Sequence, residues 1–174
     1  KGFITISGPT KSGKSQLAEF LIKDQRSITY IATSKPREND PEWEKRVNAH
    51  RIRRPYYWKL IEHPTDILKS LESLDENESI LLDSLGGLVE HYLMVDDYKW
   101  LLLQDKIVSS IVSASFMIIV VAEELGWGIV PSTAIGNQFR ERHSKLFSLL
   151  SMHSTKKFLA INGMAIDIDK IGFP

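Results

Sequence analysis

Residues 4–21 read ITISGPTKSGKSQLAEFL, and this stretch decides the expected fold. A mostly apolar run opens it, as in a buried strand, and apolar residues at helical spacing follow Ser15. Between them lies the pattern G-x-x-x-x-G-K-[ST], which is typical of a P-loop that binds nucleotide phosphates. The eight residues of this loop are Gly8, Pro9, Thr10, Lys11, Ser12, Gly13, Lys14 and Ser15.

Each part of the loop has a chemical role in phosphate binding. The glycines let backbone amides approach an anion, and the start of the following helix offers free N–H groups and a positive dipole end. We expect Lys14 to reach the β- and γ-phosphates and the Ser15 hydroxyl to ligate Mg²⁺. A chance match is the alternative, but the loop stands between a predicted strand and a predicted helix, as the motif requires.

The rest of the chain alternates between short apolar runs and helical patterns. Strands are predicted at residues 3–7, 28–32, 58–62, 80–83, 116–122, 157–161 and 165–168. Helices are predicted at residues 15–23, 41–51, 66–74, 85–93, 99–113 and 132–152. The pattern predicts one α/β domain over residues 1–174, a P-loop NTPase of RecA-like type. Its central sheet would be mostly parallel, with helices on both faces and a short antiparallel strand near the C-terminus.

The composition excludes several classes of protein. Lys and Arg number 22, as do Asp and Glu, so no global field attracts the chain to nucleic acid or an acidic membrane. The chain has no cysteine, which excludes disulfides, thiolate zinc sites and cysteine nucleophiles. The apolar run at 116–122 is too short to span a bilayer, and we expect neither a signal peptide nor stable membrane insertion. A chain without cysteine suits a reducing compartment, so a cytoplasmic protein is expected.

A carboxylate partner for the loop is predicted in ILLDS, residues 80–84. Asp83 follows three apolar residues, which places it at the carboxyl edge of a buried strand, where open α/β sheets bind ligands. It could hold Mg²⁺ or act as a base toward an acceptor hydroxyl. The alternative is an N-cap for the helix that begins at Leu85, a role that Ser84 could also fill.

Four further segments accompany the loop, in the order ITYIATS (28–34), RVNAHRIRRP (46–55), ILLDSLGGLV (80–89) and EELGWGIVP (123–131). Together they resemble the adenosylcobinamide kinase/adenosylcobinamide-phosphate guanylyltransferase family of cobalamin biosynthesis. The resemblance covers nearly the whole chain. Its most specific parts are the YIATS strand, the RxxxHxxxRP segment and the GxGIVP turn.

The resemblance implies a transferase with two reactions. ATP or GTP first phosphorylates the aminopropanol hydroxyl of adenosylcobinamide. GTP then guanylylates a histidine, and the GMP passes to the phosphorylated corrinoid to give adenosylcobinamide-GDP, with release of pyrophosphate. The family also implies a homotrimer, in which Trp100 and Trp127 could form subunit contacts or else pack in the core.

The resemblance also assigns residues to these reactions. His50 matches the nucleophile, and a neutral imidazole can attack an α-phosphate near pH 7. Taken alone, His50 would be interpreted as a surface residue on a charged helix. Arg46, Arg54 and Pro55 match the family on either side of it. Arg51, Arg53 and Arg54 could hold triphosphate oxygens or form a solvated basic face.

Three more residues match positions at the nucleotide site. Thr33 and Ser34 end the YIATS strand, and ordinary strand-end capping is their alternative role. Glu124 matches an acid at the active-site face. The other histidines, by contrast, show no metal-binding spacing and are interpreted as structural or surface residues: His63, His91, His143 and His153.

The sequence departs from the family pattern at three places. The loop carries Lys11 where the family usually has Arg, and Pro9-Thr10 where it usually has Gly and a variable residue, and these changes preserve the anion cradle. Glu123 replaces a usual Asn, and its charge could repel phosphate unless the side chain turns away or faces Mg²⁺. Residues 140–148, RERHSKLFS, replace R-D-x-x-G-R-V-N-Q. The lost polar groups could hold substrate, in which case one activity is weakened, or they could contact another subunit. Two other functions therefore stay open, a kinase-only P-loop enzyme and a noncatalytic nucleotide-binding regulatory protein.

Overall fold

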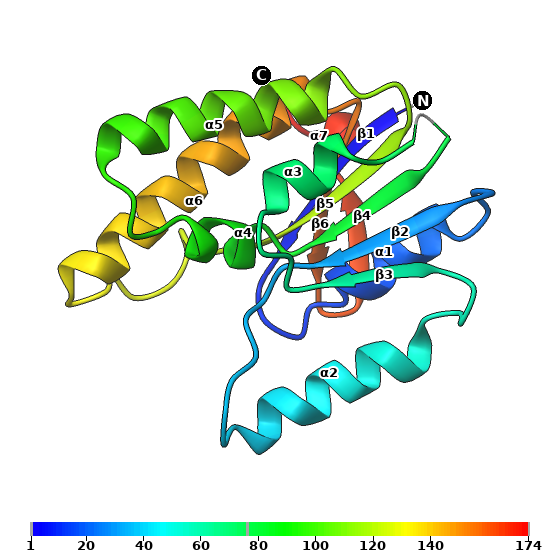
Figure 1. The fold of residues 1–174 in the computed structure, drawn as a ribbon, viewed down its shortest axis with the longest axis horizontal. Helices are drawn as coiled ribbons and strands as arrows, with labels where there is room; N and C mark the ends of the chain where they lie inside the picture. Colours follow the sequence, from blue (N-terminus) through cyan, green and yellow to red (C-terminus); the bar gives the residue numbers. More distant parts are fainter. Residues whose placement is uncertain (1, 76, 174) are drawn as a thin grey trace.

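The computed structural model describes residues 2–75 and 77–173, without the side chain of Arg46. In this part of the chain seven strands form one sheet in the order β3-β2-β4-β5-β1-β6-β7 (Figure 1). The strands are β1 (Gly2–Gly8), β2 (Ile28–Ala32), β3 (Lys59–Glu62), β4 (Ser79–Asp83), β5 (Met117–Glu123), β6 (Lys156–Ile161) and β7 (Met164–Asp167). All seven predicted strands are therefore confirmed.

The six predicted helices are also present, with ends that differ from the prediction by at most two residues. They are α1 (Lys14–Ile22), α2 (Pro41–Arg53), α3 (Ile67–Glu72), α4 (Leu85–His91), α5 (Asp97–Val112) and α6 (Ala134–His153). A short α7 (Ile168–Ile171) was not predicted. Within residues 2–75 and 77–173, no helix combines the length and apolar character needed to cross a bilayer.

Every neighbouring pair of strands is parallel except the last, β6 with β7, as the sequence predicts. Asn162 and Gly163 join this antiparallel pair, with φ of 51° and 76°. Positive φ at both central residues is the geometry of a type I′ turn, for which Asn-Gly is the favoured sequence. The chain thus reverses direction between β6, which pairs with β1, and β7, which is the edge strand.

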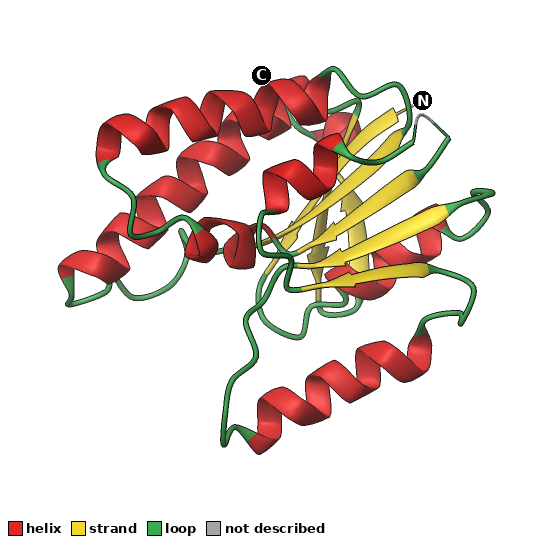
Figure 2. Cartoon of the chain, viewed as in Figure 1, coloured by secondary structure: helices red, strands yellow, loops and turns green. Residues whose placement is uncertain are grey.

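Helices cover both faces of the sheet (Figure 2). Alternate residues of β5 face opposite sides: Ile118 and Val120 join the core formed with α3 to α6, whereas Ile119 and Val121 pack against α1. A parallel strand buried on both faces needs such a continuous apolar run. The mostly parallel α/β fold with two helical layers is therefore confirmed.

The two tryptophans considered for subunit contacts have different environments. Trp100 is only 4% exposed, and the Arg142 guanidinium lies 5.0 Å from its ring centroid. It packs in the core, which is one of the two roles that the sequence left open for Trp100. Helical periodicity alone did not reveal this, because the partner comes from α6. Trp127 is 65% exposed.

Candidate nucleotide-binding site

The P-loop connects β1 to α1, and the β6–β7 hairpin packs against it. A Cβ at Gly8 would lie 2.3 Å from the Ala160 carbonyl oxygen, so only glycine fits there. The Gly163 amide donates to the Ser12 carbonyl at 3.1 Å. Gly13 has φ 95°, a conformation that L side chains rarely adopt. The glycines of the motif therefore allow the loop to pack against the hairpin, and they also allow backbone amides to approach phosphate.

Two side chains of the loop are arranged as a phosphate site requires. Lys14 Nζ donates to the Pro9 carbonyl at 3.1 Å, so the ammonium lies over the loop itself. The Ser12 hydroxyl is buried and has no hydrogen-bond partner among the described residues. A buried hydroxyl without a partner is costly, and a phosphate oxygen would satisfy it.

Asp83 is the last residue of β4, so it lies at the carboxyl ends of the strands, as the P-loop does. Strand β5 separates the two, since it pairs Val121 with Asp83 on one side and Glu123 with Gly8 on the other. The Tyr30 hydroxyl donates to Asp83 Oδ2. Burial and the neighbouring Asp83 charge raise the pKa of Tyr30 well above its usual value, so the phenol stays a donor. The N-cap residue of α4 is Ser84, and its side chain forms no cap hydrogen bond within the described residues.

His50 lies beside this carboxylate. Its Nδ1 atom is 3.9 Å from Asp83 Oδ2 and 3.2 Å from Nη2 of Arg53. Burial lowers the pKa of His50, which favours the neutral imidazole. Arg53 also binds Glu19 of α1 through two hydrogen bonds, of 2.6 and 2.8 Å. This ion pair connects α2 to α1 and places the histidine near the P-loop helix.

Two other arginines, one in α2 and one at its C-cap, differ in their partners. Arg51 pairs with Glu62, with a shortest nitrogen–oxygen distance of 2.9 Å. The Arg54 guanidinium lies 3.8 Å from the Tyr30 ring centroid, and its Nε and Nη1 atoms are buried without partners in the described part of the chain. Arg54 thus has donors available to an anion. The side chain of Arg46 lies outside the described residues.

Thr33 has a structural role at this edge. It is fully buried, and its hydroxyl donates to the Ser84 carbonyl at 2.6 Å and accepts from the Ser84 amide at 2.9 Å. This is the capping role that was the alternative for Thr33, whereas Ser34 is exposed. Contact of either residue with nucleotide stays a prediction.

Gly87 of α4 packs against this threonine so closely that a side chain has no room. A Cβ at Gly87 would lie 2.3 Å from Thr33 Oγ1 and 2.8 Å from the Ser34 amide nitrogen. Gly87→Ala should therefore lower the free energy of unfolding by about 1–3 kcal/mol, measured by urea denaturation. Gly128→Ala is the matched control, because nothing lies within 4 Å of a Cβ there. Equal stability of the two variants would contradict this packing.

Mg²⁺ needs few protein ligands when a nucleotide supplies the others. The described residues contain no group of three or more acidic or histidine side chains that could hold a metal by themselves. Ser15, the second residue of α1, is half-buried and offers a hydroxyl, and Asp83 offers a carboxylate at the same edge. These oxygen donors fit a Mg²⁺ ion that is bound mainly through phosphates and water.

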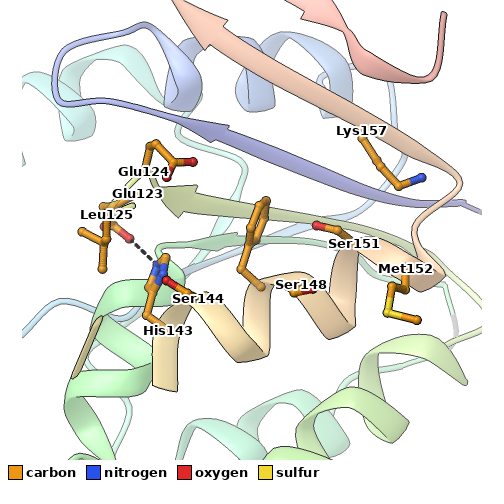
Figure 3. A pocket seen from close by; sticks show the side chains of 10 residues that line it. Glu123, Glu124, Leu125, His143, Ser144, Ser148, Ser151, Met152 and Lys157 are labelled. Atoms are coloured by element: carbon orange, nitrogen blue, oxygen red, sulfur yellow. Dashed lines mark ion pairs between the residues drawn. The ribbon is translucent and has the colours of Figure 1, made fainter. Parts of the chain in front are cut away.

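Glu123 turns away from the phosphate cradle. Its carboxylate accepts hydrogen bonds from Ser84 Oγ and from the Gly86 amide, the latter at 3.0 Å, and lies 3.4 Å from His143 Nε2 (Figure 3). Burial raises the pKa of Glu123, but the bonds from His143 and Ser84 outweigh burial and lower it. The carboxylate is thus ionised and satisfied. His143 is 2% exposed on α6, so it is not a surface residue.

A cavity of about 580 Å³ adjoins this pair, between α6 and the ends of β5 and β6 (Figure 3). Glu124, Phe147 and Lys157 are among its lining residues. The Glu124 amide donates to the Gly8 carbonyl at 3.0 Å, and its side chain accepts from the Gly126 amide at 2.9 Å. Glu124 therefore stands next to the P-loop, as the resemblance implies.

Sequence reasoning missed three groups at this site. Tyr30 and Glu19 could not be identified, because their partners Asp83 and Arg53 are distant in the sequence. The pair Gly86-Gly87 could have been noticed, since two consecutive glycines at the start of a predicted helix lower helix propensity and indicate close packing.

Residues 4–168 match the family model described as cobinamide kinase / cobinamide phosphate guanyltransferase. The chain belongs to this family. Members of the cobinamide kinase / cobinamide phosphate guanyltransferase family are transferases, and the resemblance found in the sequence is confirmed. The family match covers the P-loop, the His50 helix and Asp83 together.

Relatives of this family extend the comparison. The bifunctional adenosylcobalamin biosynthesis protein CobU of Escherichia coli K12 is 27% identical, with 95% of this chain and 98% of that protein covered. CobP of Pseudomonas aeruginosa, with the same description, is 27% identical, with 94% of this chain and 95% of that protein covered.

Solved structures with low sequence identity support the fold alone. An ATPase of a type III secretion system has a TM-score of 0.54 at 12% identity, with 97% of this chain and 57% of that chain covered. A protein from Pyrococcus horikoshii OT3 has a TM-score of 0.51 at 8% identity, with 96% and 85% covered. The mostly parallel α/β fold is thus shared with proteins of low sequence identity.

Proposed function

We propose that the protein phosphorylates adenosylcobinamide with ATP or GTP and then transfers GMP from GTP to the product through guanylylated His50. The observation that carries the proposal is the position of His50, next to Asp83 and at the same sheet edge as the P-loop. A nucleophile and a phosphate cradle are thereby near each other. The family assignment supports the two reactions.

In the kinase reaction the corrinoid hydroxyl oxygen attacks the γ-phosphorus, and the bond from that phosphorus to the β-phosphate oxygen breaks. Lys14 and the amides of the loop stabilise the charge on the β- and γ-phosphates. Asp83 is suited to accept the hydroxyl proton or to bind Mg²⁺, which neutralises phosphate charge when bound. Tyr30 holds the carboxylate in place for either role.

In the transfer reaction a ring nitrogen of His50 attacks the α-phosphorus of GTP, and pyrophosphate leaves. In the present arrangement Arg53 donates to Nδ1, so the neutral ring carries its proton on Nε2. If Nδ1–H donated to Asp83 instead, the Nε2 lone pair would be free to attack. The phosphate of the corrinoid then attacks the bound GMP, and breaking the N–P bond restores the imidazole.

The departure from the family pattern at Glu123 is compatible with both reactions. Glu123 is occupied by partners from α4 and α6, so its charge is not directed at phosphate. A kinase-only enzyme remains the second candidate, because Phe147 replaces a polar family residue in the cavity beside Glu124. It would bind GTP without forming a GMP adduct. We also propose the homotrimeric assembly implied by the family and a cytoplasmic location.

Asp83→Asn tests the shared carboxylate. The variant keeps the shape but loses the charge that binds Mg²⁺ or accepts a proton, so the rate of ATP-dependent phosphorylation should fall roughly tenfold to a hundredfold. The corrinoid product can be quantified by chromatography over a series of Mg²⁺ concentrations. Asp105→Asn, on the exposed side of α5, serves as control. If the phosphorylation rate and its Mg²⁺ dependence were unchanged, the role of Asp83 would be structural.

A further inference from the structure

Helix α2, which carries His50, is attached to the rest of the molecule through polar contacts. It lies apart from the helices that cover the sheet (Figure 1), and none of its described side chains is buried. A helix that buries no apolar side chain gains little stability from packing, so its position depends on charged and hydrogen-bonding groups. The place of His50 at the site is therefore determined by those groups.

The ion pairs that link α2 to the body of the molecule differ in exposure. Arg51 pairs with Glu62 of β3, and these side chains are 52% and 41% exposed. Arg53 pairs with Glu19 of α1 through two hydrogen bonds, and these side chains are 32% and 11% exposed. Solvent weakens the first pair, whereas a bidentate pair with a nearly buried carboxylate is stronger. The main ionic link of α2 is therefore to the helix that follows the P-loop.

Arg53 contacts this helix and the proposed nucleophile at the same time. Its Nε and Nη2 atoms donate to Glu19, and Nη2 also lies 3.2 Å from Nδ1 of His50. The guanidinium is a planar fork with fixed donor directions, so the position of Glu19 determines where the imidazole contact lies. A lysine ammonium is a single point charge and cannot form the same bidentate bridge.

We propose that Arg53 and Glu19 are positioning residues for guanylyl transfer, because they fix α2 to the P-loop helix and thereby hold His50 at the site. The inference rests on the proposed function, since it requires His50 to be the nucleophile. It gives Arg53 a role other than holding triphosphate oxygens, because Glu19 occupies donors of the guanidinium. Phosphorylation of the corrinoid uses Lys14 and Asp83, which belong to α1 and β4, so it does not need this pair.

The charge of Arg53 also acts on the imidazole. Burial lowers the pKa of His50 most, and Arg53 and Arg54 lower it further, whereas Asp83 and Glu19 raise it. Only the neutral ring attacks phosphorus, so the rate of adduct formation rises as the pH increases through this pKa. Loss of the Arg53 charge should therefore raise the pKa of His50 and move the midpoint of the rise to higher pH.

The test measures the rate of GMP-adduct formation by intact mass spectrometry, over a range of pH at saturating GTP and Mg²⁺. The proteins are the parent, Arg53→Gln, Arg53→Lys and Glu19→Gln, and ATP-dependent phosphorylation of adenosylcobinamide is measured on the same preparations. Lys45→Gln is the matched control, because Lys45 is a cation of the same helix whose pair with Glu42 is exposed, at 74% and 80%. Circular dichroism and the urea midpoint show whether each variant is folded.

We expect Arg53→Gln and Glu19→Gln to form the adduct roughly tenfold to a hundredfold more slowly, since a small displacement of a reacting group has effects of this size. Phosphorylation should stay within about twofold of the parent, because the P-loop is unchanged. Arg53→Gln should also shift the pH midpoint upward. Arg53→Lys should keep the parent midpoint but recover only part of the rate, and Lys45→Gln should match the parent in every measurement.

Several results would overturn the positioning role while His50 remains the nucleophile. One is adduct formation at the parent rate in Arg53→Gln, and another is an equal loss of both reactions in Arg53→Gln and Glu19→Gln. A slower adduct with an unchanged pH midpoint in Arg53→Gln would reduce the arginine to a structural role, and full activity of Arg53→Lys would show that the bidentate bridge is unnecessary. If the parent protein formed no adduct, the proposed function itself would fail.

Discussion

Lys14→Ala should lower the rate of phosphoryl transfer from ATP roughly a hundredfold to a thousandfold. The ammonium stabilises charge that grows on the phosphate oxygens in the transition state, and removal of one such donor has effects of this size. The rate of adenosylcobinamide phosphorylation at saturating ATP measures the loss. The fold should persist, because Lys14 is only half-buried and its ammonium donates to the Pro9 carbonyl of the same loop.

Lys106→Ala provides the comparison for this variant. Lys106 is exposed on α5 and has no ion pair within the described residues, so its replacement should leave the rate unchanged. Circular dichroism and the urea midpoint show whether both variants remain folded. A folded Lys14→Ala protein with the rate of the parent would refute a phosphate role for the loop lysine.

His50→Ala should abolish formation of adenosylcobinamide-GDP from GTP and phosphorylated adenosylcobinamide. No other group at the site replaces a covalent nucleophile, so activity should fall to background. ATP-dependent phosphorylation should stay within about threefold of the parent, since the imidazole takes no part in that reaction. Chromatography of the corrinoid products reports both reactions from the same sample.

His153→Ala is the matched control, because this histidine is exposed at the end of α6. It should keep both activities. If His50→Ala still produced adenosylcobinamide-GDP at the parent rate, transfer would not pass through this histidine. Loss of both activities together would indicate that His50 has a structural role in α2.

Local sequence predicted most of the fold. The P-loop, its strand and its helix are contiguous in the chain. One motif and the change from an apolar run to helical spacing were therefore sufficient to predict all three. The Asn162-Gly163 turn is likewise local, and the antiparallel strand near the C-terminus followed from the short apolar runs around it. α7 escaped prediction because it has only four residues, fewer than a periodic pattern needs.

The surroundings of the site depend on contacts between distant segments. The sequence left open whether the charge of Glu123 faces phosphate, and in the structure His143 of α6 and Ser84 beside α4 are its partners. Nothing in the spacing of these residues predicted their contact. The Ala160 carbonyl that requires glycine at position 8 comes from the far end of the chain. Such side-chain pairs follow from the packed fold and not from local pattern.

Intact mass spectrometry of the protein after incubation with GTP and Mg²⁺ tests the central claim most directly. The account predicts one GMP-sized adduct on the parent protein and none on His50→Ala. Absence of the adduct from the parent, with GTP binding demonstrated separately, would contradict histidine-mediated guanylyl transfer and leave a kinase or a noncatalytic nucleotide-binding protein.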